Sequence, residues 1–213
     1  GLGVLISQYF GAGQEDYVKK IIANAVYITA AAGILMSLCG VLFAEPILRL
    51  MNTPKENFAD ALVYMRIVCG ATVVVAGYNM ISAILRALGD SKTPLLFLAA
   101  ASGLNIALDL IFVLVFQMGT AGAAWATVIA QVAAMIGSIW FGTKKNPYLK
   151  LEKRHFCFEK GILKDSLRLG LPIAAQNAMV SFSCLSLQIV VNRYCAVVMA
   201  AYTATSRVEQ LVQ

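Results

Sequence analysis

Five apolar runs constrain the fold of this chain more than any other feature. A helix needs about 20 residues to cross the ~30 Å hydrocarbon core of a bilayer, and each run has about that length. Charged residues make up only 13% of the chain, too few to cover a soluble surface. We therefore predict an all-α integral membrane protein, a polytopic helical bundle, with spans at 21–43, 67–85, 95–116, 121–142 and 169–191.

Both ends of the chain suggest a larger protein. The sequence begins with Gly1 rather than Met and lacks the charged start and cleavage site of a signal peptide. A sixth apolar run begins near Ala196 and stops at Gln213. We expect these residues to be part of a longer multispanning protein.

Basic residues are divided unevenly between the connections. If the connections alternate sides, twelve Lys and Arg lie on one side and four on the other. Positive charge gathers on the cytoplasmic side, so we predict a multi-pass protein of the cell (plasma or inner) membrane with segment 143–165 in the cytoplasm. This topology accounts for the net charge of +6 without nucleic-acid binding. The twelve are Lys19, Lys20, Arg86, Lys92, Lys144, Lys145, Lys150, Lys153, Arg154, Lys160, Lys164 and Arg168, and the four are Arg49, Lys55, Arg66 and Arg193.

Cysteine and histidine give no pattern of a metal site or a catalytic centre. The five cysteines lack metal-ligand spacing, and His155, the single histidine, has no ligand partner nearby in the sequence. A nucleophile, a base and an orienting group do not recur together. We predict that the protein is not an enzyme and binds neither a metal nor a cofactor.

Segment 143–165 is the longest polar stretch and is rich in lysine. It could link two structural halves, although its composition fits an ordinary basic cytoplasmic loop equally well. We divide the chain into a first part, 1–142, this linker, and the start of a second part, 166–213.

A carboxylate lies inside the third apolar run. A charge in mid-span costs ~2.5–3.5 kcal/mol on insertion scales, so Asp109 must face the bundle interior or a wet cavity. Ser102, Asn105 and Asp109 are spaced three and four apart, which places them on one helix face. The run therefore carries a single polar stripe.

The next run carries a matching stripe. The connection around Met118 is so short that the two helices must be antiparallel, and equal spacing pairs Asp109 with Thr127 and Asn105 with Gln131. This predicts polar levels roughly 13 and 20 Å from the turn. Interhelical hydrogen bonding that only holds the bundle together is the alternative, and it suits Gln131 better than Asp109.

The stretch ILRALGDSKTPL predicts a tight turn between two helices. Gly89 fits a C-cap, Thr93 an N-cap and Pro94 the first helical position. Arg86 and Asp90 are spaced as an i, i+4 ion pair.

The segments SQYFGAG, ILRALGDSKTPL, NIALDLIFVLVFQMGTAGAAWATVIAQ and LRLGLPIAAQNA together resemble the multidrug and toxic compound extrusion (MATE) transporters. The resemblance covers essentially the whole chain. It implies part of a two-lobe, twelve-helix transporter, from the end of helix 2 into helix 8, with 143–165 between the lobes. It also implies export of cationic or amphipathic drugs in exchange for protons or sodium.

Residue by residue, the resemblance places the coupling-ion site on Asn105, Asp109 and Thr127. The helix spacing adds Gln131 and Ser102 as possible supporting polar residues. Its other acid lies on helix 1, which is not in this sequence, and the region 176–184 has no acid. We therefore expect proton rather than sodium coupling.

We expect the substrate cavity to be lined by Met80, Met135, Gln176 and Met179. The expected partners are small organic molecules and membrane lipid, not nucleic acid, and we expect a monomer. A lipid-linked oligosaccharide flippase of the same wider superfamily is the alternative function. Flippases of that kind line their cavity with cations, and here no Lys or Arg lies near mid-span.

Overall fold

The computed structural model of the chain describes residues 2–50, 55–151, 155–156 and 159–191. Every regular element in these ranges is helical. The chain divides into a first compact unit, Leu2–Ser166, and a second unit from Leu167 that is described as far as Val191. The helices are α1 (Leu2–Gly11), α2 (Glu15–Leu50), α3 (Lys55–Gly70), α4 (Thr72–Ala87), α5 (Lys92–Asp109), η1 (Leu110–Val115), α6 (Gly119–Lys145), η2 (Pro147–Leu149) and α7 (Lys160–Val191).

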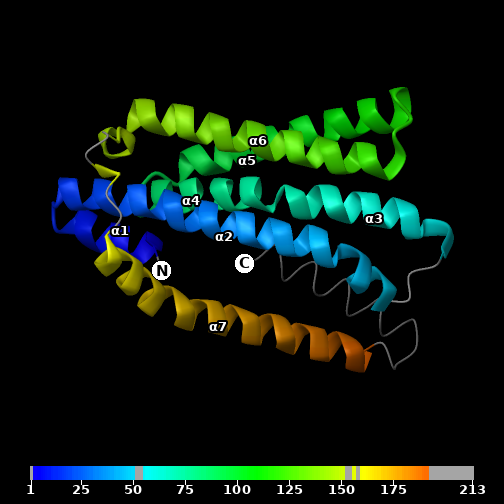
Figure 1. Ribbon diagram of the computed structural model, residues 1–213. Helices are drawn as coiled ribbons and strands as arrows, with labels where there is room; N and C mark the ends of the chain where they lie inside the picture. The colour runs from blue at the N-terminus through cyan, green and yellow to red at the C-terminus, as the bar shows by residue number, and fades with distance from the viewer. Residues whose placement is uncertain (1, 51–54, 152–154, 157–158, 192–213) are drawn as a thin grey trace. The chain divides into compact units, whose positions relative to one another are not determined.

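The helices of the first unit pack in three layers (Figure 1). The middle layer consists of α3 and α4, which contact α2 on one side and α6 on the other. Beside α2 lies α1, which also touches α4, and α5 packs on α6. The predicted all-α helical bundle is confirmed.

Three of the described helices are long and apolar enough to cross a membrane, and a bent pair forms a fourth span if it is counted as one. The first four predicted runs coincide with these spans, and the fifth lies within α7. The sixth, from Ala196, falls outside the described residues. The spans are Glu15–Arg49, Phe58–Gly70 with Thr72–Ala87, Lys92–Val115 and Gly119–Lys145.

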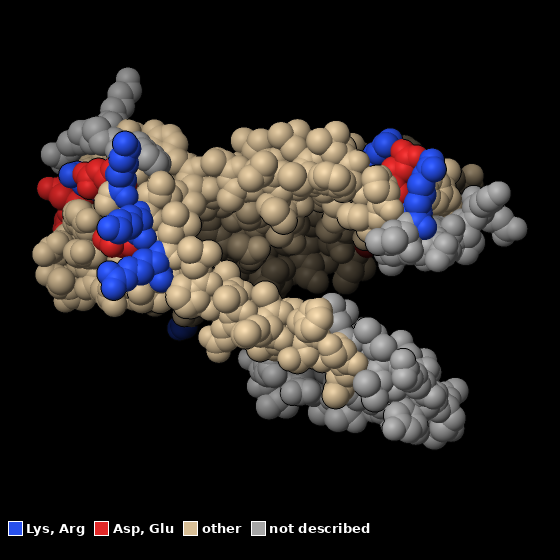
Figure 2. All heavy atoms as spheres, turned by 60° about the horizontal axis from the view of Figure 1, so that its bottom comes forward, with Lys and Arg blue, Asp and Glu red and all other residues tan. Residues whose placement is uncertain are grey.

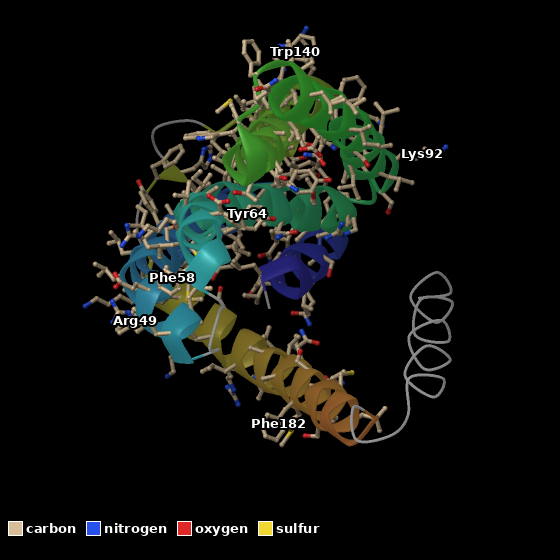
Figure 3. All side chains as sticks on the ribbon, turned by 90° about the vertical axis from the view of Figure 1, so that its right-hand side faces the viewer. Arg49, Phe58, Tyr64, Lys92, Trp140 and Phe182 are labelled. Carbon is tan, nitrogen blue, oxygen red and sulfur yellow. The ribbon has the colours of Figure 1, made fainter. Side chains whose placement is uncertain are left out.

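Charged side chains gather at the two ends of the first unit on the face that Figure 2 shows, with an uncharged band between them. Near one end, Trp140 projects away from the bundle (Figure 3), and the Lys144 ammonium lies 4.0 Å from its ring centroid. An exposed tryptophan beside a long cationic side chain is typical of a membrane interface. We call this end, formed by the α4–α5 turn, the end of α6 and residues 146–151, 155–156 and 159–166, the basic end.

The second span is broken between α3 and α4, where it bends by 40°. Beside the break, the N–H of Val73 donates to Ser37 Oγ of α2 at 3.2 Å. Gly33 and Gly40 flank Ser37 on one face of α2, and Cβ atoms added to them would lie 3.0 and 2.8 Å from the nearest atoms of the broken span. Small residues therefore let α2 approach, and Ser37 satisfies a backbone group beside the break.

Hydrogen bonds fix both ends of the α4–α5 turn. Gly89, with φ +85°, and Asp90 close α4 in a Schellman motif. The Asp90 carboxylate then accepts the N–H and the hydroxyl of Thr93 at 3.1 and 2.7 Å, so Asp90 rather than Thr93 supplies the cap. The predicted Arg86–Asp90 pair is wrong, because the left-handed Gly89 turns Asp90 off the helix. Asp90 pairs instead with Lys145 at 3.0 Å.

Asp90 is 8% exposed, and its surroundings favour the ionised form. Burial alone would raise the pKa of Asp90. The hydrogen bonds from Thr93 and the Lys145 ammonium outweigh burial and lower this pKa below its usual value. The charged carboxylate therefore ties the start of α5 to the end of α6.

The polar segment after α6 packs on the start of α2. Lys20 Nζ lies 2.7 Å from Glu159 Oε1, and the Glu159 N–H donates to Asn24 Oδ1 at 3.1 Å. His155 is buried, with Nε2 3.6 Å from Asp16 Oδ1. The segment is thus part of the packed first unit. Its role as a link between two lobes stays a prediction, as does the division at 142 and 165.

Candidate functional site

Asn105 of α5 and Thr127 of α6 meet across the hairpin that these helices form. Asn105 Nδ2 donates to Thr127 Oγ1 at 3.4 Å. The Thr127 hydroxyl in turn donates to the Ala123 carbonyl at 3.0 Å. Asn105 is half-buried, whereas Thr127 is exposed in the described chain. Two of the predicted site residues are therefore joined by a short chain of hydrogen bonds.

This contact differs by one helical turn from the predicted register. Equal spacing about Met118 pairs Asn105 with Gln131 and Asp109 with Thr127. In the structure Thr127 is opposite Asn105. Asp109 consequently lies one turn closer to the α5–α6 connection than the joined pair.

The π-helix η1, which follows Asp109 directly, contributes to the shift. The N–H of Phe116 donates to the Ile111 carbonyl, and that of Met118 to the Phe112 carbonyl, both at 3.0 Å. A π-helix advances less per residue than an α-helix because each of its turns holds more residues. The part of the hairpin formed by α5 and η1 therefore needs more residues to cover a given distance from the connection than a rise of ~1.5 Å per residue implies.

Asp109 presents an enclosed carboxylate oxygen. Its Oδ1 has no contact with solvent and, among the residues that the structure describes, no hydrogen-bond partner. Asp109 is half-buried as a whole, and an enclosed, unpaired carboxylate oxygen is costly while the group is charged. Binding a proton or a cation would remove that cost, and the Asn105–Thr127 pair one turn away offers polar atoms beside it.

Gln131 and Ser102 lie away from this carboxylate. With Asn105 opposite Thr127, Gln131 is one turn beyond them in the direction opposite to Asp109. The two side chains are thus separated by ~12 Å along the helix axes. Gln131 Oε1 is enclosed without a hydrogen-bond partner in the described part of the chain, and Ser102 is exposed. The geometry does not bring either residue to Asp109.

The four predicted cavity residues are split between the two units. Met135 of α6 packs against Gly77 of α4, where an added Cβ would lie 2.6 Å from its sulfur. Met80 is half-buried on α4. Gln176 and Met179 are exposed on α7 in the second unit. Their role as cavity walls stays a prediction.

A pocket of about 480 Å³ opens near the end opposite to the basic end. Its walls include Asp60 and Tyr64 of α3, Leu48 of α2 and Thr120 of α6, and Tyr64 can be located in Figure 3. This pocket was not predicted, because the predicted second span begins at residue 67, whereas α3 begins at Lys55. The signal available was the apolar spacing of Ala61, Tyr64 and Met65 upstream of that run, in phase with Val68 inside it.

The sequence matches a known family and curated proteins. The MatE family model matches residues 1–111. "Probable multidrug resistance protein YoeA" of Bacillus subtilis (strain 168) is 31% identical over 220 residues, which cover 100% of this chain and 48% of that protein. "Multidrug export protein MepA" of Staphylococcus aureus (strain MRSA252) is 24% identical, over 99% of this chain and 47% of that protein. The chain spans about half the length of the curated relatives it matches.

Solved structures show the same fold. A crystal structure of MATE in the bent conformation has a TM-score of 0.89 and 26% identity, covering 99% of this chain and 48% of that one. The inward-facing conformation of a multidrug resistance MATE family transporter has a TM-score of 0.75 and 28% identity, covering 81% of this chain and 39% of that one. The helical arrangement described above is therefore shared over nearly the whole chain.

Proposed function

The chain belongs to the MatE family, a family of transporters and not of enzymes, and on this premise we propose that the whole protein is a cation-coupled antiporter that exports drugs or other toxic organic compounds. The relatives named as multidrug resistance and export proteins support this substrate class. The chain itself is part of a multi-pass membrane protein.

One observation carries the proposal more than any other: the enclosed Oδ1 of Asp109, which has no hydrogen-bond partner among the described residues. A bundle that needed only interhelical hydrogen bonds would be served by an amide at lower cost. A carboxylate in this place is useful if it binds and releases a positive charge. Asn105 and Thr127 would then be hydrogen-bonding partners of the loaded site.

Loading the carboxylate can be coupled to a conformational change. A bound proton or cation cancels the charge and so removes its cost in a medium of low dielectric constant. If a helical element has two packing arrangements, the free-energy difference between the loaded and the unloaded carboxylate can favour one arrangement over the other. In this chain η1 next to Asp109 and the break between α3 and α4 are the irregular segments of the spans, and we propose them as the parts that respond.

The proposed coupling ion is a proton. Sodium needs several oxygen ligands, whereas a proton needs one carboxylate. The Thr127 hydroxyl is already engaged with Asn105 and Ala123, and residues 176–184 of α7 contain no acid that would add a second cation site. Both observations favour a proton, which needs fewer ligands than sodium does.

We expect the full-length parent, in inverted vesicles, to move a fluorescent cationic drug when a pH gradient alone is imposed. The direction is into the vesicle lumen, which corresponds to export from the cell. Dye accumulation with and without the gradient is the measurement. If a sodium gradient alone drives accumulation and a pH gradient does not, the proton assignment is wrong. If neither gradient drives it, the antiport proposal fails.

The basic end is proposed to face the cytoplasm, since positive charge is retained on that side. In a cysteine-free background, a membrane-impermeant maleimide added to intact cells should label Met118→Cys and leave Lys150→Cys unlabelled until the membrane is opened. Met118 lies in the α5–α6 connection and Lys150 follows η2, and both are exposed. The opposite labelling pattern would reverse the orientation.

A further inference from the structure

An apolar crevice of about 490 Å³ opens at the basic end, between α2 and the segment that leads into α7. Tyr27, Ile28 and Ala31 of α2 form one wall, and Phe156 and Leu163 form the other. It is separate from the candidate ion site, which lies between α5 and α6. Neither the coupling mechanism nor the proposed substrate path uses it.

Contacts within the first unit hold the two walls in place. The rings of Tyr27 and Phe156 meet edge to face with centroids 6.0 Å apart, and the Tyr27 hydroxyl donates to the Phe156 carbonyl at 3.4 Å. The segment that carries Phe156 is also held to α2 by the ion pair of Lys20 with Glu159 at 2.7 Å. The crevice is thus built by the fold and does not depend on a ligand to form it.

Two lysines flank the crevice on α7. At ~100° per residue, Leu163 lies between the buried positions Ile162 and Ser166 on one side and the exposed Lys160 and Lys164 on the other. The first turn of α7 contains no acidic residue. In the described part of the chain no ion pair occupies either lysine.

The electrostatics at this place favour an anion. Lys160 and Lys164 lie at the start of a helix, where the macrodipole is positive and cations are unfavourable. Asp165 is exposed one residue beyond Lys164, ~100° further round the helix and away from Leu163. Glu159, the other nearby acid, is already paired with Lys20. An anionic group between the two lysines would relieve their repulsion.

The apolar walls of the crevice lie further along α2 than its charged start. Tyr27 is seven residues along α2 from Lys20, or ~10 Å, so the apolar walls begin where the charged end of α2 stops. We propose that this crevice is a binding site for an anionic phospholipid, with one acyl chain against Tyr27, Ile28 and Leu163 and the phosphate between Lys160 and Lys164. Phospholipids with anionic headgroups are attracted to such juxtamembrane cations.

The test uses the purified full-length parent in detergent, with phosphatidylglycerol and phosphatidylcholine of the same acyl chains as probes. Native mass spectrometry measures the affinity for each lipid. Wild type should prefer phosphatidylglycerol. The Lys160→Gln/Lys164→Gln pair should lose about fivefold per lysine, or about twenty-five-fold in all, since each cation near a surface contributes ~1 kcal/mol. Affinity for phosphatidylcholine, which also has a phosphate but no net charge, should fall much less.

Two further variants separate the site from general charge effects. Lys92→Gln/Lys150→Gln removes the same two charges from exposed positions elsewhere at the basic end, and it should bind phosphatidylglycerol like wild type. Ala31→Phe fills the crevice and should weaken binding of both lipids.

Equal phosphatidylglycerol affinity in the two double variants would overturn the proposal. Tetraphenylphosphonium tests the other occupant, an amphipathic organic cation. If it displaces the lipid and binds more tightly once Lys160 and Lys164 are replaced, the crevice takes a cation and the lipid assignment is wrong.

Discussion

Asp109→Asn is expected to abolish ion-coupled export while the protein still inserts and folds. Asparagine has nearly the same shape as aspartate, but its amide neither takes up a proton at physiological pH nor carries the negative charge that loading must cancel. The bundle around the enclosed Oδ1 should therefore be kept. Drug accumulation driven by a pH gradient in inverted vesicles should fall to the rate of vesicles without the protein.

Asp165→Asn is the matched control, because Asp165 is an exposed acid near the start of α7 and lies outside the bundle core. This variant should export like wild type. The amount of each variant in the membrane and its thermal midpoint show whether insertion and folding are unchanged. Wild-type export by Asp109→Asn would remove Asp109 from the mechanism.

Gly33→Leu should destabilise the first unit by at least ~1–3 kcal/mol, the usual cost of overpacking a well-packed core. A Cβ at Gly33 would lie 3.0 Å from the Val73 Cα, a backbone atom that cannot rotate out of the way. Moving α2 back would also lengthen the hydrogen bond from the Val73 N–H to Ser37 Oγ. The thermal midpoint of the purified full-length parent measures the loss.

Gly103→Leu makes the same substitution in another span. No atom lies within 4 Å of a Cβ added at Gly103, and the residue is exposed on α5. Leucine is also a better helix former than glycine by somewhat under 1 kcal/mol, so this variant should be as stable as wild type or slightly more so. Equal midpoints for the two leucine variants would show that the approach of α2 to the broken span contributes little.

The facing of Asn105 and Thr127 could be predicted in part. A short connection requires antiparallel neighbours, which places the two residues on adjoining helices. Their register could not be predicted, because Leu110–Val115 is an apolar stretch that would suit an α-helix equally well. The π-helix contributes to the one-turn shift of the pairing, which places Gln131 further from Asp109.

The features that composition hides depend on contacts between distant residues. The break before Thr72 follows small and apolar residues that are ordinary in a span. Beside it, the Val73 N–H donates to Ser37 of α2, which lies 36 residues earlier in the sequence. The lysine-rich segment after α6 has the composition of a solvated loop. It packs nonetheless, because Lys20 and Glu159, 139 residues apart, form an ion pair. Neither partner can be recognised from its own neighbourhood in the sequence.

The packing of that segment changes what kind of mechanical joint it can be. A polar linker that is free in water behaves as a flexible coil and does not fix the orientation of the segments that it joins. Here the chain has already entered α7 at Lys160, inside the first unit, and the same helix continues past Ser166 into the second. The connection after Ser166 is therefore helical backbone, whose own hydrogen bonds resist stretching, and not a solvated coil.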